Sequence, residues 1–108
     1  MDQQAQAKYG PWALITGATS GIGRELARQL ASNHMNIVAV GRRQARLDAL
    51  ATELKAQFGV TVLPVPANLR DPVAIRTIVS STEGLDIGLV ILNAGAELTG
   101  SFVQVDET

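Results

Sequence analysis

The stretch ALITGATSGIG, residues 13–23, joins an apolar run directly to three glycines, Gly17, Gly21 and Gly23. The apolar residues that end at Thr16 have the length of a strand. Glycines allow a sharp turn and a close approach of the backbone to a ligand, and the residues after them take up the period of a helix. A strand, a glycine loop and a helix N-terminus in this order are typical of a phosphate-binding site. Thr19 and Ser20 are expected to add hydroxyl donors.

The rest of the chain alternates between strand and helix patterns. The apolar runs 36–41, 60–65 and 87–92 have the length of buried strands. The helix that starts near Gly21 is expected to bury one stripe, formed by Ile22, Leu26, Leu30, Ala27 and Ala31.

Two more amphipathic helices are predicted between the later strands. The first presents Leu47, Leu50, Leu54 and Phe58 on one face, and Gly59 is placed to cap its C-terminus. The second is expected to begin at Asp71 and Pro72, as N-cap and first-turn proline, and to end at Gly84. Its apolar residues are Ile75, Ile78 and Val79.

Strands that alternate with helices pair in parallel through right-handed crossovers. The sequence therefore predicts an α/β fold, a doubly wound Rossmann-type sheet covered by helices on both faces, over residues 11–108. Residues 1–10 form a polar N-terminal segment. In such a sheet, ligands bind beyond the carboxyl ends of the strands, which is where the glycine loop lies.

Composition narrows the function. The 108 residues are 46% hydrophobic and 18% charged with a net charge of −1, as in one ordinary globular domain, and no basic excess suggests a nucleic acid partner. No apolar stretch is long enough for a transmembrane helix and no signal peptide pattern is present, so the cytoplasm is the expected location. With no cysteine and with His34 as the only histidine, no disulfide, thiol nucleophile or histidine metal cluster is expected.

The glycine spacing is G-x-x-x-G-x-G, which differs from the G-x-G-x-x-G dinucleotide fingerprint and from the P-loop. A glycine cluster of this kind also occurs in turns without a ligand. However, Thr16-Gly17-Ala18-Thr19-Ser20-Gly21-Ile22-Gly23, followed after the fourth strand by Asn93-Ala94-Gly95, resembles the two motifs of the short-chain dehydrogenase/reductase family. The resemblance runs from about Lys8 to Thr108 and implies strand order 3-2-1-4 and a nicotinamide dinucleotide on the first loop.

The resemblance also implies which residues meet the cofactor. The glycine loop would hold the pyrophosphate, Asn93 would support the central strand, and Ala94 and Gly95 would line the adenosine ribose side. With the arginines and the adenine contacts considered next, the expected cofactor-binding residues are Gly17, Thr19, Ser20, Gly21, Ile22, Gly23, Arg42, Arg43, Asn68, Leu69, Asn93, Ala94 and Gly95.

The end of the second strand indicates NADP rather than NAD. NAD-preferring dinucleotide folds usually place an acid there, but this chain has Gly41-Arg42-Arg43 and no acid before Asp48. A guanidinium binds a 2′-phosphate through charge-assisted hydrogen bonds, so Arg42 is expected to make that contact and Arg43 to lie near the adenine. The alternative for both is a solvated arginine that opens a helix.

Asn68 has two interpretations. Family members carry an aspartate near the end of strand three that accepts from the adenine amino group, and here the stretch reads Ala67-Asn68-Leu69. The Asn68 amide oxygen is able to accept the same bond without charge. Alternatively, Asn68 is a turn residue that bonds its own backbone.

The catalytic residues that the resemblance implies are absent from these 108 residues. Family members exchange the substrate proton through a Tyr-x-x-x-Lys pair helped by an upstream serine, but the only tyrosine here is Tyr9 and the only lysines are Lys8 and Lys55. We therefore expect the cofactor-binding half of a longer NADP-dependent oxidoreductase, inactive alone, with residues 106–108 starting a further helix. The fourth strand is then expected to be an unpaired edge that exposes residues 89–92.

Segments 8–13 and 84–89 look like those flanking the same motifs in hydroxysteroid dehydrogenases and 3-oxoacyl thioester reductases. The expected substrate is therefore a small hydrophobic carbonyl or alcohol, and the parent protein is expected to be a homo-oligomer. Two other interpretations remain: a non-catalytic dinucleotide-binding or regulatory module complete at 108 residues, and a structural domain with a decayed loop that associates through its sheet edge.

Overall fold

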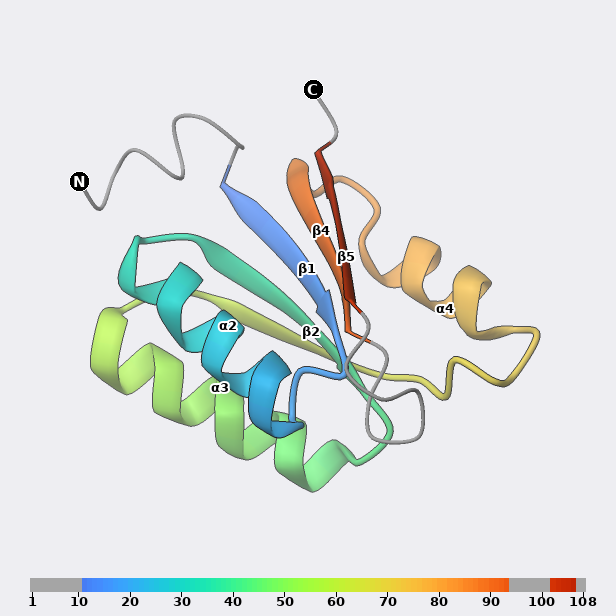
Figure 1. The fold of residues 1–108 in the computed structure, drawn as a ribbon, viewed down its shortest axis with the longest axis horizontal. Coiled ribbons are helices and arrows are strands. Elements are labelled where there is room, and N and C mark those ends of the chain that lie inside the picture. The colour runs from blue at the N-terminus through green and yellow to red at the C-terminus, as the bar shows by residue number, and fades with distance from the viewer. Residues whose placement is uncertain (1–10, 94–101, 107–108) are drawn as a thin grey trace.

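The structure, a computed structural model, describes residues 11–93 and 102–106. Its core is a sheet with the strand order β3-β2-β1-β4-β5 (Figure 1). The strands are β1 (Trp12–Thr16), β2 (Asn36–Gly41), β3 (Val62–Pro66), β4 (Ile87–Asn93) and β5 (Phe102–Asp106). The first four pair in parallel, which confirms the predicted Rossmann-type order 3-2-1-4.

Helices cover both faces of the sheet, because alternate residues of the buried strands point to opposite sides. The helices α2 (Gly21–Ser32) and α3 (Gln44–Phe58) lie together on one face, and α4 (Ala74–Ser81) lies on the other (Figure 1). Ile15 of β1 and Ile37 of β2 pack under α2 and α3, whereas Leu14 and Val38 belong to the second apolar cluster, on the α4 side.

The buried side of α2 is built from smaller residues than the sequence pattern predicts. Gly23, Ala27 and Ala31 are buried, while Leu26 and Leu30 are only partly buried against the core. Ile22 is 52% exposed, so its expected place on the buried stripe was wrong. Small residues let α2 approach the sheet closely, and Ile22 is left at the surface beside the glycine loop.

The third predicted helix begins later than expected. Its first residue is Ala74 and its N-cap is Val73, which makes no side-chain cap bond. Asp71 instead accepts a hydrogen bond from the Val73 N–H at 3.0 Å, an Asx turn placed before the helix. The helix ends at Ser81, ahead of Gly84, which has φ +83. Ile75 and Val79 are 65% and 58% exposed, so of the three predicted apolar residues only Ile78 packs against the core.

The bounds of β3 differ from the prediction, whereas the buried face and the C-terminus of α3 confirm it. β3 occupies Val62–Pro66 instead of 60–65. The three leucines of α3 are buried, with Phe58 partly buried against them, and Gly59 caps the helix with φ +72, as predicted.

The fourth strand is not an edge. β5 pairs with β4 in antiparallel, with Leu89 opposite Asp106 and Asn93 opposite Phe102, so residues 89–92 have a neighbour on each side. Asp106 therefore belongs to a strand and not to the expected helix start. The regular alternation of strands and helices predicted a helix after β4, so it gave no signal for this antiparallel return strand.

Candidate dinucleotide site

The predicted site lies at the carboxyl ends of β1, β2 and β4. Residues 17–20 leave β1 as a loop and lead directly into α2, whose first residue is Gly21. The loop is tied to the neighbouring strand, because the Ala18 N–H donates to the Val40 carbonyl at 3.1 Å. The end of β1 thus meets the end of β2 beside a helix N-terminus, the usual position of a ligand in such a sheet.

Three backbone N–H groups at the loop remain for a ligand. In the described part of the chain, no hydrogen bond is formed by the N–H of Thr19, Gly21 or Ile22, whereas that of Ser20 donates to Gly17 and that of Gly23 to the Ser20 hydroxyl. N–H groups in the first turn of a helix carry its positive dipole end. Such an arrangement is suited to an anion without any charged side chain.

The three glycines differ in what surrounds them. A Cβ at Gly23 would overlap the Gly17 carbonyl, and one at Gly17, which has φ +62, would lie 2.8 Å from the Asn93 carbonyl oxygen. A Cβ at Gly21 would meet nothing within 4 Å. The fold therefore needs Gly17 and Gly23 for packing, while at Gly21 it leaves open space on the side where a ligand would sit.

Asn93 joins the glycine loop to the end of β4. Its side chain is buried, and its amide nitrogen donates to the Gly17 carbonyl at 3.1 Å and to the Ser20 hydroxyl at 2.7 Å. Thr16, which the motifs did not single out as a site residue, holds the Asn93 backbone: its hydroxyl accepts from the Asn93 N–H at 2.9 Å and donates to the Asn93 carbonyl at 3.3 Å. A hydroxyl at the end of an otherwise apolar strand was the available signal.

The Ser20 hydroxyl is an internal group. It donates to the Gly17 carbonyl at 2.8 Å and accepts from the Gly23 N–H at 3.3 Å, which makes Ser20 the N-cap of α2. In the ligand-free chain its proton is thus already donated to Gly17, and its expected role as a hydroxyl donor to the ligand stays a prediction. Thr19 forms no side-chain hydrogen bond within residues 11–93, and its hydroxyl lies 3.6 Å from the position of a Cβ on Gly41.

Arg42 and Arg43 follow β2 immediately, on the Gly41 side of the loop. Both side chains are exposed, and neither forms an ion pair with a described residue. Arg43 is the N-cap residue of α3 without a side-chain cap bond, so its side chain has no role in starting that helix. The two arginines thus directly follow Gly41, the residue that approaches Thr19, and the sequence has no carboxylate between them and Asp48.

Asn68 lies beside the end of β2, since the Ala67 N–H donates to the Gly41 carbonyl at 2.8 Å. Its side-chain oxygen accepts from the Arg70 N–H at 3.0 Å, so the interpretation as a turn residue describes the observed geometry. Leu69 is 49% exposed next to it. An exposed Asn68 keeps a second lone pair for an adenine amino group. Ala94 and Gly95 lie outside the described residues.

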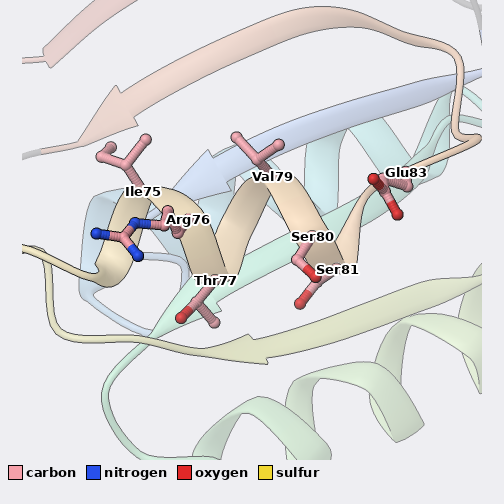
Figure 2. A pocket seen from close by; sticks show the side chains of 7 residues that line it. All are labelled: Ile75, Arg76, Thr77, Val79, Ser80, Ser81 and Glu83. Carbon is pink, nitrogen blue, oxygen red and sulfur yellow. The ribbon is translucent and has the colours of Figure 1, made fainter.

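A shallow hollow lies along α4 (Figure 2), which is on the opposite face of the sheet from α2 and α3. Ile75 and Val79 point to the same side of the helix, and Thr77 and Ser81 point to the other. The residues that line this hollow include none of the predicted site residues. Among the helices in the described ranges, none is long and apolar enough to cross a membrane.

The chain matches known proteins over most of its length. Residues 11–108 match the family model for short chain dehydrogenases. A 7beta-hydroxysteroid dehydrogenase of Collinsella aerofaciens is 43% identical over 83 residues, which are 77% of this chain and 32% of that protein. A very-long-chain 3-oxoacyl-CoA reductase of Podospora anserina is 37% identical over 106 residues, 94% of this chain and 31% of that protein.

Solved structures give the same result. The L-sorbose reductase of Gluconobacter frateurii, solved with NADPH and L-sorbose, superposes with a TM-score of 0.75 at 35% identity over 80% of this chain and 34% of its own. A short-chain dehydrogenase of Sphingobium yanoikuyae in complex with NADPH gives 0.69 at 33% identity, over 84% of this chain and 38% of its own. The chain spans about a third of the length of the curated relatives it matches. From fold, glycine loop and these likenesses together, the chain belongs to the short-chain dehydrogenase family.

Proposed function

We propose that this chain binds NADP(H) and forms the dinucleotide-binding part of an oxidoreductase that transfers a hydride between NADP(H) and a carbonyl or alcohol substrate. The observation that carries the choice of cofactor is the pair of exposed arginines, Arg42 and Arg43, at the end of β2 beside the glycine loop. Related structures that contain NADPH support it.

The chain's own groups fit the pyrophosphate of such a cofactor. The N–H groups of Thr19, Gly21 and Ile22 supply donors, the dipole of α2 supplies a positive end, and Gly21 leaves the approach open. A phosphate oxygen needs hydrogen-bond donors around it, and a carbonyl oxygen that points at it would repel it. The Gly17 carbonyl does not point at this space, because it accepts hydrogen bonds from Ser20 and Asn93.

Arg42 supplies the discrimination between the two dinucleotides. NADP carries a 2′-phosphate where NAD carries a hydroxyl, and a guanidinium binds that phosphate through paired charge-assisted hydrogen bonds. A carboxylate in the same place would repel the phosphate. Arg43 adds positive charge near the adenine side, where Asn68 offers an uncharged acceptor in place of the family's aspartate.

The bound nicotinamide would supply the hydride chemistry, and the described residues would bind and orient the cofactor. The 108 residues contain no Tyr-x-x-x-Lys pair for substrate proton exchange, so we propose that they do not turn substrate over alone. The names of the relatives, hydroxysteroid dehydrogenase and 3-oxoacyl-CoA reductase, favour a hydrophobic carbonyl or alcohol as the substrate of the whole protein.

The same absence of a Tyr-x-x-x-Lys pair favours a second candidate, a dinucleotide-binding module without catalysis. Intact-mass measurement of the protein isolated from its source separates the two. A longer product that carries a serine and then Tyr-x-x-x-Lys supports the oxidoreductase, and a native product of 108 residues supports the module.

Calorimetric titration of NADP and NAD into the unsubstituted 108-residue chain, called the parent chain below, and into its Arg42→Ala variant tests the choice of cofactor. We expect Arg42→Ala to weaken NADP binding by about 1.5–3 kcal/mol, the range for a hydrogen bond to a charged group, and to leave NAD binding nearly unchanged. Arg76→Ala, an exposed arginine on α4, is the matched control and is expected to change neither affinity. An equal loss for both dinucleotides in Arg42→Ala would contradict the assignment.

A further inference from the structure

We infer that Ser20 is a positioning residue of the dinucleotide site: its hydroxyl fastens the glycine loop to Asn93 at the end of β4 and does not itself bind phosphate. This inference rests on the proposed function and names the residue that holds the site in shape. The hydroxyl of Thr19 is the one that remains available to a ligand.

The hydrogen-bonding capacity of Ser20 is fully used. A serine hydroxyl has one donor and two acceptor positions. The donor goes to the Gly17 carbonyl at 2.8 Å, and the acceptors receive the Gly23 N–H at 3.3 Å and the Asn93 amide at 2.7 Å. A phosphate oxygen would have to break the bond to Gly17 in order to reach this proton.

The bonds of Ser20 converge on a single backbone carbonyl. The Gly17 oxygen accepts from the Ser20 hydroxyl, from the Ser20 N–H at 3.1 Å and from the Asn93 amide at 3.1 Å. Gly17 itself has φ +62, which turns its peptide into this position. Held inward, the carbonyl dipole cannot face an anion, and the N–H groups of Gly21 and Ile22 are presented instead.

The Asn93 amide completes the connection. Both of its donor positions are used, one for Gly17 and one for Ser20, and the Asn93 backbone is in turn held by the Thr16 hydroxyl. The loop after β1 and the end of β4 therefore keep one relative position. Loss of the Ser20 hydroxyl leaves an Asn93 donor and a Gly17 acceptor without this partner inside a half-buried contact, so the loop is expected to relax.

The test compares Ser20→Ala, Ser20→Thr, Thr19→Ala and the parent chain, with Ser32→Ala as control, because Ser32 also donates to a backbone carbonyl in α2 but far from the loop. Two quantities are measured at a temperature where circular dichroism shows each variant folded. These are the dissociation constants for NADP and NAD, and the NMR resonances of the Asn93 side-chain amide in the ligand-free chain.

We expect Ser20→Ala to weaken NADP and NAD binding by the same factor, about three- to tenfold for one lost hydrogen bond, and to shift the Asn93 amide resonances. Ser20→Thr keeps the hydroxyl and is expected to restore both. Thr19→Ala is expected to weaken binding without moving the Asn93 resonances, and Ser32→Ala to change neither quantity.

Unchanged Asn93 resonances in Ser20→Ala, or unchanged affinity in that variant while the parent binds, would overturn the positioning role. Failure of Ser20→Thr to restore the parent values would do so too. Failure of the parent chain to bind either dinucleotide would instead overturn the proposed function, and the ligand-free resonances would still report on the contact between Ser20 and Asn93.

Discussion

At the scale of single residues, the glycine loop separates what the fold requires from what a ligand requires. Gly21→Ala places a methyl group in open space at the first position of α2, so we expect the unfolding free energy to stay within about 1 kcal/mol of the parent value or to rise. Dinucleotide affinity is expected to fall, because the methyl group occupies the approach to the N–H groups. Chemical unfolding and calorimetric titration measure the two effects.

Gly23→Ala is the matched comparison. Its methyl group would overlap the Gly17 carbonyl and press on the Asn93 amide, so we expect destabilisation of about 1–3 kcal/mol or more, as for overpacked sites. If Gly21→Ala proves as destabilising as Gly23→Ala, the distinction between packing glycines and the ligand-facing glycine is wrong.

The two sequence motifs meet in the structure, where Asn93 bonds the loop that carries Gly17, but the motifs did not show what each residue does there. They could not show that Ser20 turns inward, because that depends on the buried amide of Asn93, 73 residues away in the chain. The same holds for Thr16, whose partner also lies on β4.

At the scale of elements, β3 ends the sheet with two prolines on its outer side. The Ile37 N–H donates to the Thr61 carbonyl and the Ala67 N–H donates to the Gly41 carbonyl. The backbone N–H and C=O groups of the odd-numbered residues along β3 therefore point towards β2. The backbone groups of the even-numbered residues point away from β2, and these residues include Pro64 and Pro66. Proline has no N–H to offer, so the outer side of β3 lacks donors at these two positions, which a further strand would need.

We expect the double substitution Pro64→Val and Pro66→Val to increase self-association, because it restores two outward N–H donors on a strand of high β-propensity. Sedimentation velocity over a concentration series measures the effect. Pro72→Ala, an exposed proline in the turn before α4, serves as control. Equal sedimentation of the double variant and the parent would contradict this role of the prolines.

On α2, an exposed ion pair predicts a pH-dependent contribution to stability. The Arg28 guanidinium, with help from Gln29, lowers the pKa of Glu25 from 4.5 to about 2. A lowered carboxyl pKa in the folded state stabilises the fold above pH 4.5, and the contribution is lost as the pH falls towards 2. Solvent and salt screen such a pair, so the effect is small.

Urea unfolding of the parent and of Glu25→Gln between pH 6 and pH 2 checks this effect. We expect the parent to lose stability more steeply than Glu25→Gln below pH 4.5, so that the two values converge near pH 2. Added salt should reduce the difference at the upper end. Two parallel curves would show that the pair contributes nothing.

Elements with strong periodicity were predictable, and elements set by tertiary contacts were not. The leucines of α3 and the apolar runs of β1, β2 and β4 each match their predicted positions. The start of α4 was misplaced because Asp71 caps a turn and not the helix, a choice that its sequence leaves open. β5 pairs with β4 in antiparallel, which the regular alternation of parallel strands and helices did not predict.

At the scale of the whole molecule, the two faces of the sheet differ in how they are covered. α2 and α3 share one face and bury the larger cluster, whereas α4 alone packs on the other and leaves Ile75 and Val79 exposed (Figure 1). The proposed site belongs to neither face. It lies at the carboxyl ends of the strands, where the segments that follow β1, β2 and β3 lie near the end of β4, so it joins residues from distant parts of the chain.

The central claim is that these strand ends bind a nicotinamide dinucleotide. The most direct test is to titrate NADP into the isotope-labelled chain and follow the backbone amide resonances. The account predicts saturable shifts that are largest at Thr19, Gly21, Ile22 and Arg42, with smaller shifts for NAD at Arg42. Absence of saturable shifts, or shifts centred on the α4 residues Ile75 to Val79, would contradict it.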